Sequence, residues 1–151
     1  MDHREKAMAL FREGYNCAQA VFGAFCEEFG MDFDTAMRVS QSFGGGFGRM
    51  REICGAVSGM AMTVGLSHGA ADPADKAQKA RQYEIVRALT EEYRAENGSY
   101  LCRELLGLDK AEPSPVPEER TPQYYKKRPC AELVGCAAEI LDRFYAGQNQ
   151  A

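Results

Sequence analysis

The sequence has no tryptophan, only two histidines, and no two cysteines in the C-x-x-C spacing. Since His3 and His68 are the only imidazoles, a histidine-rich metal centre is not expected. His68 is predicted to lie exposed, just beyond the end of a helix. The missing C-x-x-C spacing argues against zinc ribbons, thioredoxin-like motifs and ferredoxin-type clusters.

Long apolar runs and an excess of positive charge are also absent. No segment approaches the roughly 20 apolar residues of a membrane-spanning helix, and residues 1–6 lack the apolar stretch of a signal peptide. The formal net charge is −4, and the basic residues are scattered apart from Lys126–Arg128. We therefore expect a cytoplasmic protein that binds neither membranes nor nucleic acid.

What the sequence does contain is six cysteines in 151 residues. In a reducing compartment, permanent disulfides are not expected. Cysteines there serve as small buried side chains, metal ligands or redox thiols. A chain of this length can bury its own core, so we expect a single domain over residues 1–151.

Apolar residues recur at helical spacing through most of the chain, and no alternating pattern indicates a strand. We therefore expect an all-α bundle of about six or seven helices around a glycine-rich central helix. The expected helices cover residues 2–13, 16–29, 34–43, 52–66 and 72–97, with others beginning at 99 and 129. A loop rich in proline and charge, residues 112–122, is expected to end in a short helical turn at Tyr124 and Tyr125.

Capping residues set the expected helix starts. Asp2 and Asn16 are predicted N-caps, and Gln19 completes a capping box with Asn16. Further N-caps are predicted at Asp34, Asp72 and Ser99. The residues expected to form the buried stripe of helix 72–97 are Tyr83, Val86, Leu89 and Tyr93.

Residues 44–59 are the most unusual stretch, with a glycine-rich loop followed by Cys54 and a segment of small residues. A cysteine at the start of a helix is placed where a thiolate is easiest to stabilise. Gly55 and Gly59 share one helix face, and each costs roughly 1 kcal/mol relative to alanine. We expect this cost in helix stability to be offset either by close contact with another helix or by space beside Cys54 for a cofactor.

The glycine loop could hold an anion at the start of the following helix. However, no strand precedes it, and it matches neither the GxxxxGK[ST] nor the GxGxxG nucleotide-binding fingerprint. A turn that allows close packing is the favoured interpretation. If a cofactor does bind, the residues expected to contact it are Gly45, Gly46, Arg49, Arg51 and Gly55.

Four cysteines share one feature, because each lies in the first turn of a different expected helix: Cys17, Cys54, Cys102 and Cys130. Helix N-termini favour thiolates. Arginines close in sequence to three of these cysteines add positive charge: Arg49, Arg51, Arg103 and Arg128. Converging thiols would support either a thiol–disulfide relay or a four-thiolate zinc or iron–sulfur site.

The other two cysteines, Cys26 and Cys136, fall inside expected helices and are interpreted as core residues, with an auxiliary thiol as the alternative for Cys136. A third hypothesis treats all six cysteines as packing residues of a non-catalytic interaction module. It predicts that Cys54→Ala and Cys17→Ala leave any cellular role intact.

Five stretches, spanning most of the chain, match a known pattern: residues 15–21, 43–46, 53–59, 98–102 and 129–134. In these stretches the chain resembles the redox-active bacterial and archaeal proteins named for a C–GCAxxG–C–C cysteine pattern. The family's four cysteines correspond to those at the four helix starts. One departure is that the named motif places glycine before cysteine, whereas this chain reads Cys54-Gly55-Ala56. The resemblance implies redox activity of the cysteines and supplies no substrate.

The leading hypothesis is therefore a thiol-based redox protein with Cys54 as the central thiol. Cys17 would be its best partner, with Cys102 and Cys130 completing the cluster. Arg49 and Arg51 would stabilise a thiolate or bind an anionic partner. The sequence leaves open whether the protein is an enzyme, such as a thiol oxidoreductase. It also leaves open whether the redox partner is a protein or a small molecule, and whether the chain forms a homodimer.

Overall fold

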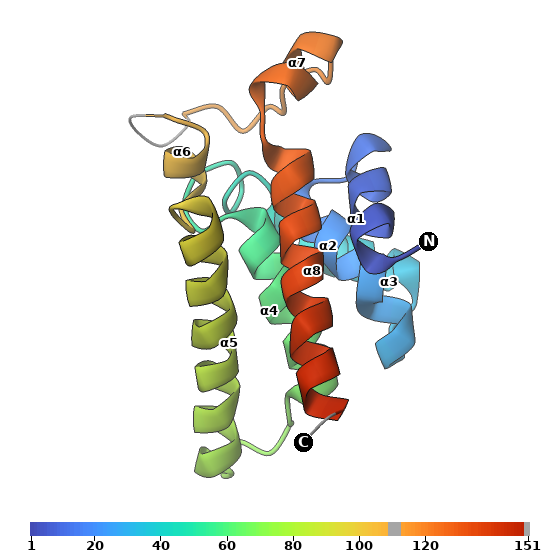
Figure 1. Cartoon of the computed structure of the whole chain (residues 1–151), viewed down its shortest axis with the longest axis vertical. Helices are drawn as coiled ribbons and strands as arrows, with labels where there is room; N and C mark the ends of the chain where they lie inside the picture. The colour runs from blue at the N-terminus through green and yellow to red at the C-terminus, as the bar shows by residue number, and fades with distance from the viewer. Residues whose placement is uncertain (109–112, 150–151) are drawn as a thin grey trace.

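The computed structural model describes residues 1–108 and 113–149, and the expected all-α fold is confirmed. Over these residues it contains eight α-helices and two short 3-10 helices, with no sheet (Figure 1). The α-helices are α1 (His3–Arg12), α2 (Cys17–Phe25), α3 (Phe33–Ser40), α4 (Gly55–His68), α5 (Lys76–Asn97), α6 (Cys102–Leu105), α7 (Pro122–Lys127) and α8 (Cys130–Asn149). The 3-10 helices, Cys26–Phe29 and Gln41–Phe43, extend α2 and α3. Within the described ranges every helix is too short or too polar to cross a bilayer.

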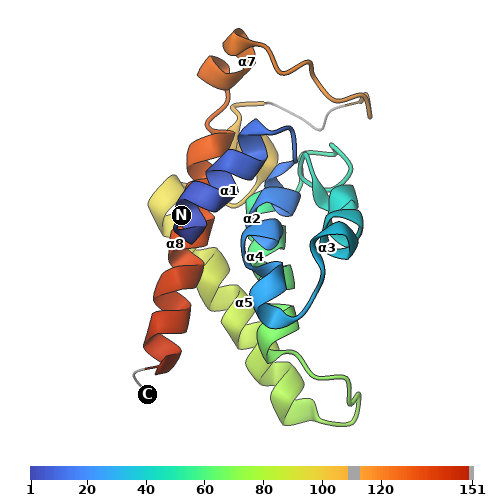
Figure 2. The ribbon, with the colours of Figure 1, turned by 90° about the vertical axis from the view of Figure 1, so that its right-hand side faces the viewer.

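The three longest helices, α4, α5 and α8, run along the long axis of the molecule, with α5 antiparallel to α8 (Figure 1). On the other side, α2 lies against both α1 and α4, and α3 covers α2 (Figure 2). The glycine-rich loop, α6, and the first turns of α4 and α8 gather at one end of the bundle, with α7 beyond them (Figures 1 and 2). Several helix N-termini therefore meet at this end.

The main core lies between α1, α2, α4, α5 and α8. Helix α5 contributes Ile85, Leu89 and Tyr93, which are spaced four residues apart and so share one face. The prediction that Tyr83 is buried was wrong: it is 61% exposed, because Ile85 lies on the inward face at this level. His68 is the last residue of α4 and is half-buried against Phe144, not exposed beyond the helix.

Both N-terminal capping predictions are confirmed. Asp2 accepts a hydrogen bond from the N–H group of Glu5 and forms a capping box with it. Asn16 accepts from the N–H group of Gln19 at 2.9 Å, and the Gln19 side chain accepts from Asn16 N–H at 3.0 Å. These two reciprocal bonds fix the first turn of α2, where Cys17 is the first residue.

For α3 and α5 the sequence predicted the wrong capping residue. Asp32, not Asp34, caps α3, since its carboxylate accepts from the N–H group of Thr35. Asp75, not Asp72, caps α5, because the Asp72 carboxylate instead accepts from Ala74 N–H in the preceding turn. In both places several aspartates compete for the cap, and tertiary packing selects one.

The glycines of α4 allow close contact with α2, as predicted. A Cβ atom at Gly59 would lie 2.8 Å from Val21 Cβ and 2.9 Å from the carbonyl oxygen of Ala18. A Cβ atom at Gly55 would lie 3.0 Å from the backbone nitrogen of Ala18. The missing side chains therefore bring the N-terminal ends of α2 and α4 together.

The loop before α4 is built from residues in the left-handed backbone region, namely Gly45, Gly46, Phe47, Gly48, Arg49 and Arg51. The backbone N–H groups of residues 47–52 all donate to carbonyl groups of residues 42–47. They are therefore engaged within the loop, which supports its interpretation as a packing turn. At Gly46 an added Cβ would lie 2.6 Å from Cys102 Cβ, so glycine permits the close approach of α6.

A short backbone bridge joins this loop to the start of α6. Ile53 and Leu101 form an isolated antiparallel bridge. Cys54 N–H donates to Tyr100 O at 2.8 Å, and Cys102 N–H donates to Glu52 O at 2.6 Å. Leu101 occupies the N-cap position of α6, and the predicted cap Ser99 instead accepts a bond from Leu101 N–H. The bridge fixes the backbone of Cys54 relative to that of Cys102.

The segment before α8 lies over the same end of the bundle. Arg120 holds it there by donating to the carbonyl oxygens of Phe11 and Tyr15, with its guanidinium 4.2 Å from the centre of the Phe11 ring. The short turn predicted at Tyr124 and Tyr125 is confirmed as α7. Of the predicted loop 112–122, residue 112 lies outside the described residues.

Candidate functional site

Cys17, Cys54, Cys102 and Cys130 line a single small cavity of about 60 Å³ at the end of the bundle where α2, α4, α6 and α8 begin. Three of them are the first residues of their helices, and Cys54 is the N-cap residue of α4, one position before its first turn. The structure therefore brings together all four cysteines singled out in the sequence. Their chemical role remains a prediction.

Cys17 and Cys130 affect each other's ionisation more strongly than any other group does. The hydrogen bond from Cys17 lowers the pKa of Cys130, and the nearby guanidinium of Arg128 lowers it further, against the opposing effect of burial. The pKa of Cys17 is raised, because its thiol donates to Cys130 and because it is buried. If one of the two ionises, it is Cys130.

Cys54 lies deeper, with 4% of its surface exposed. Burial raises its pKa to about 11, although a hydrogen bond with the Tyr93 hydroxyl at 3.2 Å and one from Ala56 N–H act in the opposite direction. The sequence analysis expected the helix start to favour a thiolate at Cys54, but the burial of this side chain acts against ionisation. Desolvation outweighs the helix N-terminus at this position.

Cys102 is also buried, and Arg51 Nη1 donates to its sulfur at 3.6 Å. Burial raises the pKa of Cys102, and the guanidinium of Arg51 offsets only part of this effect. Of the four cysteines, Cys130 alone has a lowered pKa. The arginines nearest to it, Arg128, Arg51 and Arg120, act on the same sulfur.

The residues predicted to contact a cofactor divide between two cavities. Gly45, Gly46, Gly55 and Arg51 line the cysteine cavity, and Gly45 and Arg51 also line the second cavity described next. Arg49 lines a larger neighbouring cavity of about 550 Å³, which we call the outer cavity. Arg103, although adjacent to Cys102 in sequence, lines neither of them and pairs with Glu52 at 3.0 Å.

Cys130 is the one cysteine that lines both cavities, among the residues the structure describes. The outer cavity lies between the glycine-rich loop, the end of α1, α6 and the segment leading into α8. Arg120 and Tyr124 also line both cavities, and neither was singled out as a site residue from the sequence. In the sequence, the one indication of a role for these two residues is that they are basic and aromatic side chains near the proline-rich segment. Their position at the site depends on how that segment lies over α1, which the sequence does not reveal.

Tyr93 is the other site residue that the sequence did not identify. Its helical spacing predicted a core position, which is correct, since none of its surface is exposed. Its hydroxyl group nevertheless requires a polar partner when buried, and the thiol of Cys54 supplies it.

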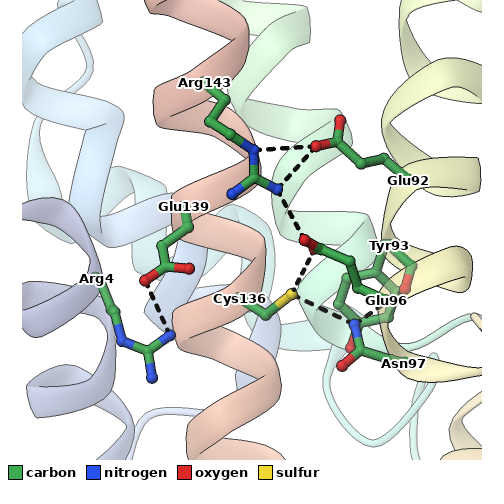
Figure 3. A network of polar contacts seen from close by, with 8 residues as sticks. All are labelled: Arg4, Glu92, Tyr93, Glu96, Asn97, Cys136, Glu139 and Arg143. Atoms are coloured by element: carbon green, nitrogen blue, oxygen red, sulfur yellow. Dashed lines mark hydrogen bonds and ion pairs between the residues drawn. The ribbon is translucent and has the colours of Figure 1, made fainter.

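Cys136 lies outside the cysteine cavity, on the α8 surface that faces α5 (Figure 3). Its thiol donates to Glu96 Oε2 at 3.1 Å and accepts from Asn97 Nδ2 at 3.4 Å. Arg143 bridges Glu92 and Glu96 in the same network. Burial and the Glu96 carboxylate raise the pKa of Cys136 to about 11, although the hydrogen bond from Asn97 acts in the opposite direction. This raised pKa disfavours a reactive thiolate at Cys136.

The remaining cysteine, Cys26, has no exposed surface and packs with Phe22, Ala36 and Met37 between α2 and α3. This agrees with its interpretation as a core residue. Burial raises its pKa as well.

The four thiols are soft donors of the kind that zinc or an iron–sulfur cluster requires. However, among residues 1–108 and 113–149 no three Cys, His, Asp or Glu side chains are grouped closely enough to hold a metal ion. The arrangement therefore does not fit a thiolate metal site as it stands.

A family model described as "Putative redox-active protein (C_GCAxxG_C_C)" matches residues 15–144. The matched range includes all four cysteines of the cavity. No curated protein and no solved structure gives a significant match to the chain.

Proposed function

The chain belongs to the family described as "Putative redox-active protein (C_GCAxxG_C_C)", and we propose that it acts through a reversible disulfide between Cys17 and Cys130. The observation that carries this proposal is that both residues line the same small cavity, where each thiol has the largest effect on the pKa of the other. A protein disulfide forms when one thiolate attacks a substrate disulfide to give a mixed disulfide, and a second thiolate then attacks that mixed disulfide and releases the remaining half of the substrate. Two adjacent thiols with opposite pKa shifts are suited to these two roles.

Cys130 is the attacking thiol in this proposal. Its pKa is lowered, which increases the fraction of thiolate, and the residue also lines the outer cavity. Cys17 stays protonated beside it until it is needed, because burial and the hydrogen bond to Cys130 raise its pKa. The raised pKa values of Cys54 and Cys102 keep these two protonated at neutral pH, so they do not compete as attacking groups.

The reaction requires a disulfide substrate as the oxidant. The Cys130 thiolate attacks one sulfur of the substrate, so that a mixed disulfide forms and the first substrate thiolate leaves. Cys17 then loses its proton and attacks the Cys130 sulfur, which forms the Cys17–Cys130 disulfide and releases the second substrate thiolate. One substrate disulfide is reduced to two thiols, the two protein thiols are oxidised, and their two protons pass to the departing thiolates.

This chemistry suits a reducing compartment such as the cytoplasm, where cellular thiols would return the pair to the reduced form. All six cysteines are free thiols in the structure, as such a resting state requires. The same proposal makes the protein a thiol oxidoreductase, with its physiological partner to be identified.

The test is to purify the reduced protein without oxygen, oxidise it mildly, and map disulfides by peptide mass spectrometry. We expect the loss of two of the six free thiols, a Cys17–Cys130 linkage, and full recovery on reduction. Cys26→Ser and Cys136→Ser serve as controls and should behave like the wild type. Six unreacted thiols, or a linkage that omits Cys130, would contradict the proposal. Metal bound stoichiometrically in the same sample and lost in Cys54→Ser would point to the metal-binding alternative.

A further inference from the structure

We infer that the outer cavity binds the negatively charged groups of a small disulfide substrate and presents its sulfurs to Cys130. This inference rests on the proposed function, and it adds the size and charge of the substrate. It starts from the position of Cys130, which lines the outer cavity as well as the cysteine cavity.

The charge of the lining carries the inference. Four arginines line the outer cavity: Arg49, Arg51, Arg120 and Arg128. Among the described lining residues Glu118 is the one carboxylate, and it pairs with both Arg49 and Arg128. The described lining therefore carries more guanidinium groups than carboxylates, although the whole chain has a formal net charge of −4.

Contacts within the protein hold these arginines at the cavity wall. Arg49 donates to Ser114 O at 2.8 Å, and Arg120 donates to Tyr15 O at 2.9 Å. Arg128 is fixed by Glu118. Guanidinium groups held in place by the fold can bind carboxylates without a large loss of side-chain entropy.

The size of the outer cavity limits the substrate. Its volume of about 550 Å³ lies inside the range of roughly 300–1,000 Å³ that is usual for small-molecule sites. The adjoining cysteine cavity, at about 60 Å³, accepts no more than the reacting sulfur or a few water molecules. A small disulfide with carboxylate groups matches this combination of volume and charge.

The arginines also assist the chemical step. As the Cys130 thiolate attacks the substrate sulfur, negative charge moves from Cys130 to the departing thiolate. That thiolate leaves into the same arginine-lined cavity, where it takes up the proton that Cys17 releases. The sequence of bonds formed and broken is the one given for the proposed function.

The test compares three small disulfides of similar size: dithiodipropionate, which carries two carboxylates, the neutral hydroxyethyl disulfide, and the doubly positive cystamine. The rate of oxidation of the Cys17–Cys130 pair is measured by acid quenching and mass spectrometry. Each rate is divided by that of mercaptoethanol with the same disulfide. We expect the normalised rate for dithiodipropionate to exceed that for cystamine by about tenfold or more, and the preference to shrink in high salt.

Arg128→Gln separates substrate binding from the effect of Arg128 on the Cys130 thiolate. A change in thiolate fraction slows all three probes equally, so it cancels in the ratio of anionic to neutral rates. We expect this ratio to fall in Arg128→Gln and to stay unchanged in Arg103→Gln, a matched arginine outside both cavities.

Equal normalised rates for all three disulfides would overturn the inference and leave the proposed function intact. An equal slowing of all probes in Arg128→Gln would also overturn it. If no probe produced a Cys17–Cys130 disulfide, the proposed function itself would fail. The comparison of probes uses the wild-type chain, so it does not depend on how well a variant folds.

Discussion

The Tyr93 hydroxyl on α5 lies 3.2 Å from the Cys54 thiol at the N-terminus of α4, and both side chains are buried. The contact ties the glycine-rich helix to α5 and places Cys54 in a structural position at the base of the cysteine cavity. Burial holds the proton on Cys54 and also raises the pKa of Tyr93. The reactive thiol of the site is therefore expected to be Cys130, which also lines the outer cavity.

We predict that protonation of Cys54 makes the folded state less stable in alkali. An unfolded cysteine ionises near pH 8.5, whereas folded Cys54 holds its proton to about pH 11. Between pH 8.5 and pH 11 the folded state binds more protons than the unfolded state. The contribution of Cys54 to the free energy of unfolding is therefore complete below about pH 8.5 and is lost as the pH rises toward 11.

Cys54→Ser tests this, because serine keeps a hydroxyl opposite Tyr93 and does not titrate in this range. The urea midpoint of the wild type should fall more steeply than that of Cys54→Ser across this window, by up to about 1.4 kcal/mol of unfolding free energy per pH unit. Parallel pH profiles for the two proteins would show that Cys54 does not hold its proton in the folded state.

Tyr93→Phe should remove the hydrogen bond to Cys54 with little change in shape. We expect a loss of roughly 1 kcal/mol of stability in urea unfolding, and a Cys54 pKa that moves further upward. Tyr83→Phe is the matched control on the same helix, because Tyr83 is 61% exposed. It should unfold like the wild type, and an equal effect of the two substitutions would argue against a specific role for the buried contact.

Arg128→Gln should raise the pKa of Cys130, since a positive charge that stabilises the thiolate is removed. Alkylation of Cys130 by iodoacetamide at neutral pH should then slow several-fold, and its pH profile should shift to higher pH. Peptide mass spectrometry resolves Cys130 from the other cysteines. Arg103→Gln provides the comparison. If the pH profile of Cys130 alkylation were identical in the two variants, Arg128 would have no specific effect on the Cys130 thiolate.

Two glycines of α4 should respond oppositely to alanine. At Gly59 the new Cβ would lie 2.8 Å from Val21 Cβ and 2.9 Å from Ala18 O, so we expect Gly59→Ala to destabilise the fold by about 1–3 kcal/mol. At Gly65 nothing lies within 4 Å, so Gly65→Ala should stabilise it by up to about 1 kcal/mol through helix propensity. Thermal unfolding of both variants tests the close contact between α2 and α4, and a stabilising Gly59→Ala would contradict it.

The local features of the fold were accessible from the sequence. Asn16 and Gln19 predicted the capping box of α2, and the spacing of Gly55 and Gly59 predicted a close helix contact, because both depend on residues a few positions apart. The choice of Asp32 over Asp34 was not accessible in this way, since either side chain can cap and only packing decides.

The order of reactivity among the cysteines depends on long-range packing. Every helix N-terminus favours a thiolate, but Tyr93 and the surrounding core desolvate Cys54, whereas Cys130 faces the arginine-lined outer cavity. The sequence places Cys17 and Cys130 near opposite ends of the chain, and no local pattern indicates that they meet. Arg120 likewise reaches the site only because its segment lies over Phe11.

The most direct test of the account is to trap the mixed disulfide that Cys130 forms. Cys17→Ser is reduced and mixed with hydroxyethyl disulfide, and the adducts are mapped by peptide mass spectrometry. We predict that the adduct accumulates on Cys130 in this variant, while the wild type proceeds to the Cys17–Cys130 disulfide. Cys130→Ser should react slowly at every cysteine. An adduct that forms first on Cys54, or a Cys130→Ser variant that reacts as fast as the wild type, would contradict the account.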